Sequence, residues 1–458
     1  MNEMKKALSA ILLAGIFLAG CNKGPSTVEV TGITLNRDSA ELVAGETFQL
    51  VATVEPENAT EKEIIFSSNN RSVATVDAAG LVSALSPGEA TITVSSVSGG
   101  AYKNFMLTVK SEVRNIGEKE SANCYIVTEP GLIGFKPFKG NTETLVGNVA
   151  SVDVIWETVN TATAPEKGTV IYDPQYKDGM VAFRVPQKMV EGNALIAAKD
   201  AGGNILWSWH IWVVDGGVGE VVMANNAGIL MDRNLGAIGT TPGDPRVNGM
   251  FYQWGRKDPF MGIATYQKPF VQYAASAEME PNAASGPELT VAWTLAHPTA
   301  WGLRNDKNND WLYTADYTTD ILRWGSGAAP KALYDPCPPG WQIPGNSGIW
   351  TTAGLTTNFA GEIVFDKDNF GCTIGSPYCT PASWWPAVGQ LANDYIRGLS
   401  WESGIYGGWW TGASTGMGGG TNNAGRDFVL LLASSLVHHD NDYKQFGAAV
   451  RCRKITED

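Results

Sequence analysis

The sequence predicts a mainly β protein, built from two β-sandwiches followed by a loop-rich α+β domain. Three observations support this fold class. The length of 458 residues suggests about three domains, at about 150 residues per domain. Short runs of β-branched and aromatic residues alternate with turns that use many of the 52 glycines and 23 prolines. After the first 20 residues, no long segment repeats its apolar residues with the 3.6-residue period of a helix.

Residues 1–20 have the layout of an export signal. Lys5 and Lys6 precede an apolar run, residues 7–18, which is too short to span a bilayer as a stable helix. A short membrane anchor or a buried helix is the alternative. The sequence Leu-Ala-Gly-Cys that ends at Cys21 resembles the bacterial lipobox, which implies cleavage before Cys21 and its lipidation. Residues 21–26 are then a lipid-anchored linker, and we expect an outer-membrane lipoprotein exposed at the cell surface.

The net charge of −13 argues against two classes of partner. Nucleic acids and anionic membrane surfaces gain no counterion release from an acidic protein. We therefore expect no nucleic-acid partner, and membrane contact only through the lipid. The sequence contains no phosphate loop, dinucleotide fingerprint or zinc-protease motif, so we expect no cofactor apart from a weak calcium signal.

Residues 27–111 read as the first sandwich. Apolar and polar residues alternate in several short runs, for example at residues 47–54 and 90–94, and Pro56, Gly80 and Gly88 lie at the turns between runs. This alternation is typical of strands with one buried face.

The order of these pieces resembles the bacterial immunoglobulin-like group 2 family. The matching segments are Thr-Gly-Ile-Thr-Leu, Gly-Glu-Thr, Pro-Glu-Asn-Ala-Thr, Val-Ala-Thr-Val-Asp and Gly-Glu-Ala-Thr-Ile-Thr-Val. Phe66 stands where the family usually has tryptophan, and an aromatic ring there still fills the core. The resemblance implies a spacer or an adhesive module, and the absence of a convergent polar site favours the spacer.

Residues 112–215 form a second β-sandwich. The turn at residues 199–204 joins two strand-like runs into a hairpin. Residues 205–214 carry large apolar side chains on both faces, which predicts an interior strand and makes His210 a hydrogen-bonded core residue rather than a ligand. Residues 122–127, followed by Pro130 and Gly131, resemble a module of exported Bacteroidetes lipoproteins.

Residues 216–458 resemble the Fibrobacter succinogenes major paralogous domain. Five segments carry the resemblance in family order: residues 231–237, 251–256, 335–344, 409–412 and 449–452. The sequence Gly-Trp-Gln-Ile-Pro at residues 340–344, followed by Trp350, also resembles the fold of C-type lectins. We expect these segments to be scaffold, with internal ion pairs and core packing for Asp232, Arg233, Arg256, Trp254, Trp341 and Trp410.

Five cysteines follow Cys21, and in an oxidising compartment they can pair. Cys372 and Cys379 are close enough in sequence to close a local loop. Cys337 and Cys452 can join the start of the C-terminal domain to its end, which suits a compact, loop-rich domain of this family. Cys124 is then left over as a buried small side chain. The sequence alone does not fix this pairing.

One polar segment could hold calcium. Asp306, Asn308 and Asp310 place oxygen atoms at alternate positions, and Ca²⁺ takes six to eight oxygen ligands. The glycine and the terminal glutamate of an EF-hand are absent, which favours a solvated polar turn. A second candidate, the residues His-His-Asp-Asn-Asp at 438–442, has no further histidine or cysteine at ligand spacing.

A cluster of aromatic residues separated by glycines is the candidate glycan site. Aromatic faces stack on pyranose rings, while neighbouring polar groups bind the hydroxyls. Adjacent residues of a strand point in opposite directions, so about one of each tryptophan pair can face a ligand, and the alternative is a core role. The candidates are Trp384, Trp385, Tyr406, Trp409 and Trp410.

The sequence favours a binding protein over an enzyme. Residues 412–416 match Gly-x-Ser-x-Gly, but no helix follows to complete a nucleophile elbow. No pair of acidic residues stands out as a glycosidase pair. We therefore expect a non-enzymatic adhesin or binding protein with a β stalk, whose C-terminal domain binds a glycan or a host or cell-surface protein. A carbohydrate-active hydrolase on the same stalk and a structural subunit of a surface assembly are the alternatives.

Overall fold

The structure, a computed structural model, has two compact units with the boundary between Glu112 and Val113. The fold is mainly β, as predicted. The residues described are 27–280, 286–303, 310–313, 323–325, 331–346, 348–355, 363–391, 406–412, 425–431, 436–442, 444 and 446–455, of which 425–431 and 436–442 are described by their backbone alone. Among them, no helix has both the length and the apolar composition needed to cross a bilayer.

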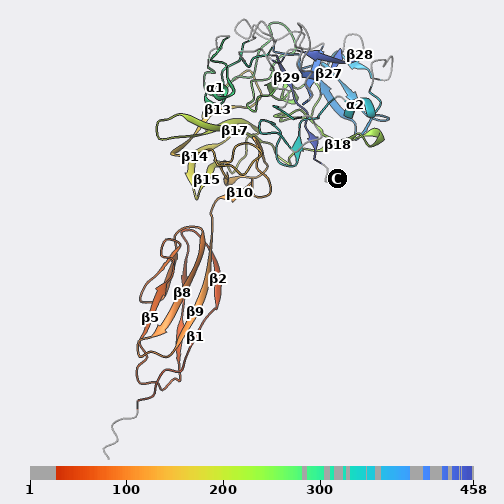
Figure 1. The fold of residues 1–458 in the computed structure, drawn as a ribbon. Coiled ribbons are helices and arrows are strands. Elements are labelled where there is room, and N and C mark those ends of the chain that lie inside the picture. The colour runs from red at the N-terminus through yellow and green to blue at the C-terminus, as the bar shows by residue number, and fades with distance from the viewer. Residues whose placement is uncertain are drawn as a thin grey trace, which may run out of the picture. The chain divides into compact units, whose positions relative to one another are not determined.

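The first unit is a β-sandwich. Its larger sheet has the order β2 (Ser39–Val43), β9 (Tyr102–Lys110), β8 (Gly88–Ser96) and β5 (Ile64–Ser68), which lie side by side in Figure 1. All pairs in this sheet are antiparallel except β2 with β9. The remaining strands form a three-stranded sheet and a pair: β3 (Thr47–Gln49), β7 (Leu81–Ala84) and β6 (Ala74–Val76), and β1 (Gly32–Leu35) with β4 (Ala52–Glu55).

The core of the first unit follows from the predicted alternation. Ile92 and Val94 of β8 are fully buried and share one core with Phe105 of β9. Phe66 packs against this core, as expected for the aromatic position. Gly80 has φ +82°, and a Cβ atom there would lie 2.4 Å from the Leu50 carbonyl oxygen, so this turn requires glycine.

The second unit begins with two four-stranded sheets. Both contain one parallel pair, β10 with β12 in one sheet and β11 with β17 in the other. The predicted hairpin is present as β16 and β17. The strand orders are β10 (Arg114–Asn115), β12 (Gly131–Phe135), β15 (Met180–Val185), β14 (Tyr172–Lys177), and β11 (Cys124–Val127), β17 (Ile205–Val213), β16 (Gly192–Lys199), β13 (Ser151–Thr158).

Strand β17 is buried on both faces, as its sequence predicts. Trp207, Trp209 and Ile211 belong to the core of the central sandwich. Trp212, on the opposite face, belongs to a second core that it shares with Trp254 of the C-terminal segment. The segments that the sequence divides at residue 215 are therefore parts of one compact unit.

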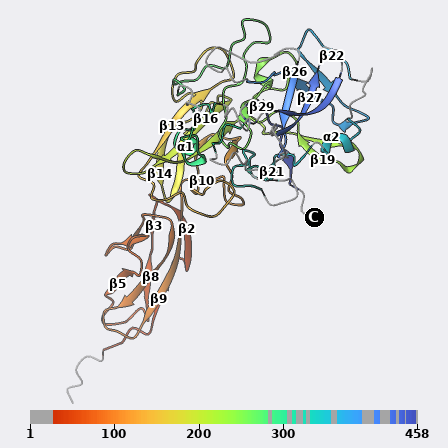
Figure 2. The ribbon, with the colours of Figure 1, turned by 45° about the horizontal axis from the view of Figure 1, so that its top comes forward.

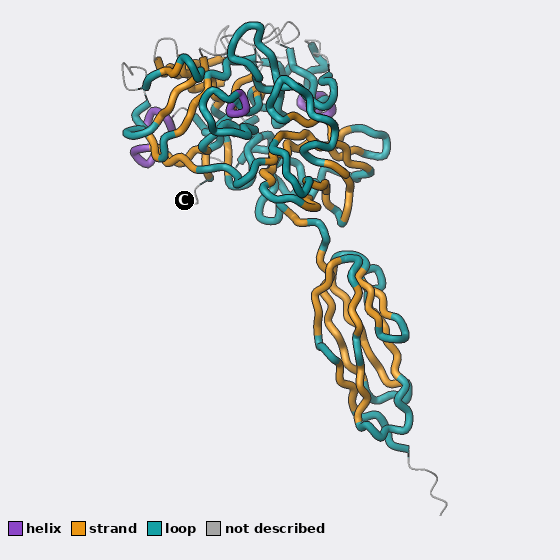
Figure 3. The backbone as a smooth tube through the Cα atoms, turned by 180° about the vertical axis from the view of Figure 1, so that it is seen from behind, coloured by secondary structure: helices purple, strands orange, loops and turns teal. Residues whose placement is uncertain are grey.

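Three further sheets make up the C-terminal part, with long loops between them (teal in Figure 3). In one of them, β26, β27 and β29 lie side by side (Figure 2). The sheets are β21 (Trp341–Gln342), β30 (Arg453–Lys454), β19 (Gly228–Met231), β18 (Glu220–Met223), β24 (Cys379–Thr380); β20 (Phe251–Gln253), β29 (Gly447–Ala449), β26 (Tyr406–Trp410), β27 (Gly425–Leu431), β28 (Leu436–Asp442); and β22 (Phe365–Asp366), β23 (Gly371–Ile374), β25 (Ser383–Pro386). The described helices are short: α1 (Val291–Ala296), α2 (Gly348–Thr352), η1 (Ala224–Asn226) and η2 (Pro245–Val247).

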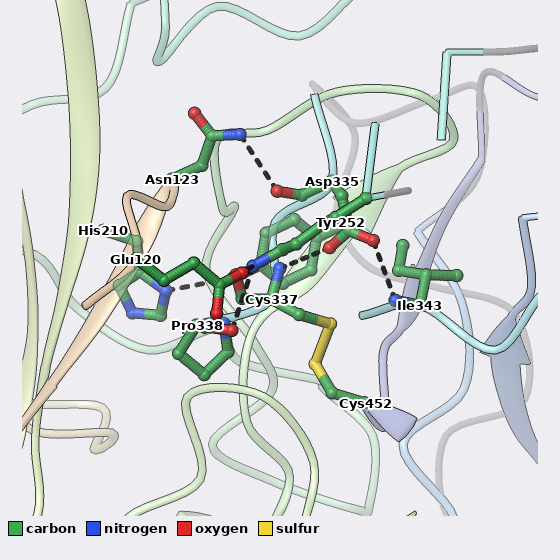
Figure 4. Close-up of a disulfide and its surroundings, with 10 residues drawn as sticks. Glu120, Asn123, His210, Tyr252, Asp335, Cys337, Pro338, Ile343 and Cys452 are labelled. Atoms are coloured by element: carbon green, nitrogen blue, oxygen red, sulfur yellow. Dashed lines mark hydrogen bonds and ion pairs between the residues drawn. A yellow bond between two sulfur atoms is a disulfide. The ribbon is translucent and has the colours of Figure 1, made fainter. Parts of the chain in front are cut away.

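A disulfide joins Cys337 and Cys452, which confirms the expected pairing of these two cysteines. Asp335 supports the bond from one side, because its carboxylate accepts hydrogen bonds from the backbone N–H groups of Cys337 at 2.8 Å and Ile343 at 2.9 Å (Figure 4). Asn123 of the central sandwich donates to the carbonyl oxygen of Asp335 at 2.9 Å. The disulfide therefore lies where the central and C-terminal segments meet.

The expected bond between Cys372 and Cys379 is wrong. Both are free and buried, and they lie in strands of different sheets, β23 and β24. The Cys379 thiol donates to the carbonyl oxygen of Ile374 at 3.3 Å. Burial raises the pKa of both thiols, which keeps them protonated. Cys124 is also free and buried, as expected for a small core side chain.

Loss of the disulfide should destabilise the second unit selectively. The double substitution Cys337→Ala and Cys452→Ala removes a link across 115 residues, which we expect to lower the free energy of unfolding by about 2–4 kcal/mol. Tryptophan fluorescence during urea unfolding measures this loss, because all 16 tryptophans lie after residue 112. Cys372→Ala is the matched control, and an equal loss in that variant would contradict the assignment.

Candidate functional site

A pocket of about 320 Å³ in the second unit combines charged, hydroxyl and aromatic side chains. Its walls come from segments that are far apart in sequence: the turn after β19, the loop that includes η2, the start of β25 and the residues after β29. The lining residues that carry a charge, a hydroxyl group or an aromatic ring are Asp232, Arg233, Thr240, Ser383, Trp384 and Arg451. A volume of this size lies at the lower end of the range for small-molecule sites.

Asp232 and Arg233 form a bidentate ion pair at the pocket wall. Nε of Arg233 lies 2.8 Å from Oδ1 of Asp232, and Nη2 lies 2.8 Å from Oδ2. Burial alone would raise the pKa of Asp232, but the hydrogen bonds and the charge of Arg233 lower it below its ordinary value. The pair is therefore ionised, in agreement with the ion pair expected here. Arg256, the other expected partner, instead donates to Gln253 and to the carbonyl oxygen of Ala300.

Arg451 is a buried cation in the same wall, with 1 % of its surface exposed. Its Nη1 donates to Oγ of Ser383 at 3.1 Å and its Nη2 donates to the carbonyl oxygen of Trp384 at 2.7 Å. Its Nε lies 3.3 Å from Oδ1 of Asn234. The guanidinium lies over the ring of Trp385, 3.8 Å from the centroid. These contacts hold the group in one orientation.

Trp384 and Trp385 point to opposite faces of β25, as the strand period predicts. Trp385 is fully buried in the core, whereas Trp384 lines the pocket and is 9 % exposed. The Trp384 ring lies against Gly371 of β23, where a Cβ atom would be 2.4 Å from its Cζ2. Glycine at residue 371 therefore fixes the position of the indole. Trp384 is the member of the predicted aromatic cluster that this pocket contains.

Trp409 and Trp410 are corrected to core roles, and the expected role of Tyr406 stays a prediction. Trp409 and Trp410 are fully buried, and their Nε1 groups donate to Oδ1 of Asn234 at 2.8 Å and to the carbonyl oxygen of Tyr252 at 2.7 Å. The Tyr406 hydroxyl, which is half-buried, accepts a hydrogen bond from Gln390 at 2.8 Å. Tryptophans packed in this way offer no face to a sugar. Trp254 and Trp341 are also buried, as expected for scaffold residues.

Asp310 is part of a buried ion pair rather than an open calcium loop. Its Oδ2 is bound by Nη2 of Arg323 and lies 3.7 Å from Nζ of Lys444, and all three side chains are fully buried. Its Oδ1 accepts a hydrogen bond from the N–H of Leu312 at 3.1 Å. The alternate spacing of Asp and Asn did not indicate that Arg323 and Lys444 would lie beside this carboxylate. Asp306 and Asn308 lie outside the described residues.

Metal binding has no candidate elsewhere in the described part of the chain. Within it, no three His, Cys, Asp or Glu side chains are placed to hold one ion. The side chains of residues 438–442 and the serine of the Gly-x-Ser-x-Gly match are outside the described residues. His210 is a core residue, as predicted: its Nε2 lies 2.8 Å from Oδ1 of Asn193 and its Nδ1 lies 3.1 Å from the Tyr252 hydroxyl (Figure 4).

The charged residues of the pocket belong to the segments that the sequence analysis assigned to scaffold. Asp232 and Arg233 come from residues 231–237, and Arg451 comes from residues 449–452. Arg451 was not among the residues that the sequence predicted to form a site. The arginines in residues 231–237 and 449–452 were a signal for this site, because a buried arginine is rare without a partner.

A family comparison identifies the first unit. Residues 29–104 match the family of bacterial Ig-like domains of group 2. The first unit is a bacterial Ig-like domain. This match confirms the resemblance that the sequence motifs suggested. The resemblance of residues 216–458 to the Fibrobacter succinogenes domain stays a prediction.

Curated relatives are similar over a length of about one such domain. An uncharacterized protein of Clostridium acetobutylicum is 44 % identical over 69 residues, which is 15 % of this chain and 17 % of the relative. The kappa-carrageenase of Pseudoalteromonas carrageenovora is 40 % identical over 86 residues, which is 19 % of this chain and 22 % of the enzyme. The chain thus spans about a fifth of the length of these relatives.

Similarity to solved structures is lower. Domains 5–6 of the S-layer protein SbsC are 13 % identical, and the alignment covers 40 % of this chain and 97 % of that chain with a TM-score of 0.16. Similarity at this level does not define a shared fold over the whole chain.

His210 should contribute a loss of stability of the second unit between pH 6.5 and about pH 3, and Asp335 should offset this contribution between about pH 6 and 3.8. Burial lowers the pKa of His210 from 6.5 to about 3, so between these values the unfolded chain binds about one more proton than the folded chain. The free energy of unfolding then falls by up to about 1.4 kcal/mol for each unit of pH decrease. Urea unfolding followed by tryptophan fluorescence measures this slope.

Two variants separate the contributing groups. His210→Gln should reduce the slope. Burial raises the pKa of Asp335 from 3.8 to about 6, which favours the folded state as the pH falls, so Asp335→Asn should make the slope steeper. An unchanged slope in His210→Gln would show that this histidine is not the group responsible.

Proposed function

We propose that this chain is a non-enzymatic binding protein of the cell envelope that binds a glycan in the pocket at Trp384. The single observation that carries the proposal is the convergence of an aromatic ring with hydroxyl and charged groups around a volume of about 320 Å³. Sugars offer C–H faces that stack on aromatic rings and hydroxyls that need fixed polar partners.

The placement in the cell envelope rests on two features. Residues 1–21 carry the export signal and the predicted lipidation site at Cys21, which lie outside the described residues. The bacterial Ig-like domain follows the predicted anchor, and its sequence shows no convergent polar site, which suits a spacer. We propose an outer-membrane lipoprotein at the cell surface, with a glycan or a host or cell-surface protein as partner and no cofactor.

The chemistry of the pocket favours binding over hydrolysis. Among the described residues that line the pocket, Asp232 is the only carboxylate. Its pKa is lowered and both its oxygens are bound by Arg233, so it is poorly suited to act as a general acid. Glycoside hydrolysis ordinarily needs two carboxylates on either side of the scissile bond. The similarity to kappa-carrageenase, which is limited to 22 % of that enzyme, does not add a catalytic pair.

Removal of the Trp384 ring should abolish most of the glycan binding. A glycan array probed with the chain from residue 22 onward should show specific binding, and Trp384→Ala should lower the affinity for the bound glycan by about tenfold or more, because the stacking face is lost. Trp384→Phe keeps an aromatic face and should retain part of the affinity.

Tyr176→Ala is the matched control, because it removes an exposed ring of the same unit outside the pocket. Equal binding by Trp384→Ala and the unsubstituted chain would show that another surface binds the glycan. No binding to any glycan would redirect the search to a protein partner or to a role as a structural subunit.

A further inference from the structure

Arg451 has more hydrogen-bond donors than partners. A guanidinium carries five N–H groups. Among the described residues, three of these donate: Nε to Asn234, Nη1 to Ser383 and Nη2 to the Trp384 carbonyl. One N–H on each terminal nitrogen therefore has no acceptor in the part of the chain that the structure describes. Since Arg451 lines the pocket, an acceptor within the pocket can complete the set.

The charge of Arg451 is also not neutralised by direct contact. Its three acceptors are uncharged, and within the described residues no carboxylate forms an ion pair with it. Asp232, the neighbouring carboxylate, has both oxygens bound by Arg233. Burial lowers the pKa of Arg451 to about 9, so the group still carries its charge at neutral pH. Asp232 attracts this charge from a distance but forms no direct ion pair with it, and a buried cation without a direct ion pair favours an anion beside it.

Arg256 shows why the pocket is the decisive feature. This arginine is also buried and also has no ion-pair contact with another described residue, but four of its hydrogen bonds go to oxygens of the chain. The space beside Arg256 is about 10 Å³, which is enough for about one water molecule. The space beside Arg451 is about 320 Å³ and has room for a ligand.

We infer that the pocket binds the carboxylate of an acidic sugar, with Arg451 and Arg233 as the groups that recognise the carboxylate. This inference rests on the proposed function, because Trp384 supplies the stacking face for the ring. Two arginines and one aspartate give the lining a net charge of +1. A guanidinium presents its N–H groups in a plane that matches a carboxylate.

The charge of the whole chain narrows the class of ligand. The net charge of −13 repels a polyanion at long range, whereas one carboxylate in a cationic pocket experiences mainly the nearby arginines. The pocket therefore suits a single acidic sugar at the end of a glycan better than a uniformly charged polysaccharide.

The test uses three oligosaccharides that differ only in their terminal sugar, which is glucuronic acid, glucose or glucose 6-sulfate. The chain from residue 22 onward should bind the glucuronic acid form about tenfold more tightly in calorimetry. Arg233→Gln changes the lining charge from +1 to 0 and should reduce this preference, while Asp232→Asn changes it to +2 and should increase it. A purely structural role for this pair would not give opposite effects.

The outcomes distinguish the inference from the proposed function. Equal affinity for both sugars, with Trp384→Ala weakening both, would overturn the acidic ligand and leave glycan binding standing. Tighter binding of a glucose 6-sulfate terminus would overturn the assignment of a carboxylate. Absence of binding to all three sugars would overturn the inference of an acidic ligand. The glycan array would then decide whether the chain binds any glycan. Tryptophan fluorescence on urea unfolding should show that the variants are folded.

Discussion

Burial of strand β17 on both faces is the constraint on which the second unit depends. Trp207 and Trp209 fill the core of the central sandwich, and Trp212 fills a core that includes Trp254 and Trp410 of the C-terminal segment. The strand contributes side chains to both cores, in agreement with the single compact unit that the two segments form. The C-terminal sheets are thereby packed together, and their connecting turns bring Asp232, Ser383 and Arg451 to one pocket.

The buried cations of this unit differ in how their charge is compensated. Lys257 is paired with Asp258 at 2.6 Å, and Arg323 is paired with Asp310. These pairs are internal, and an ion pair of this kind is sensitive to the loss of either partner. Arg451 differs because its bound acceptors are neutral and because open space lies beside it. Asp232 compensates the charge of Arg451 only at a distance, without a direct ion pair, and this leaves room for the carboxylate of a ligand in the pocket.

The sequence predicted the elements that depend on local patterns. Alternation of apolar residues predicted the first β-sandwich and the two faces of β17, and the period of two separated Trp384 from Trp385. The order of the sequence motifs, rather than the alternation, suggested the bacterial Ig-like family. The pocket could not be predicted, because Asp232 and Arg451 are distant in sequence and meet only through β19, β29 and β30. The same limit explains why the buried ion pair of Asp310 was not predicted, because Arg323 and Lys444 are distant from it in sequence. It also explains the wrong prediction of a disulfide between Cys372 and Cys379, which are close in sequence but lie in different sheets.

The pocket is built on the ends of strands and on a hydrogen-bonded loop, and this bears on what it can do. Asp232 and Arg233 directly follow β19, Ser383 and Trp384 begin β25, and Arg451 comes two residues after β29. The loop that carries Thr240 is anchored by the Tyr273 hydroxyl, which donates to the carbonyl oxygen of Pro245 at 2.6 Å. Groups fixed in this way lose little conformational freedom when a ligand binds, so more of the contact energy is available as affinity. Such preorganisation suits a site that holds a ligand in one orientation, as a binding protein does.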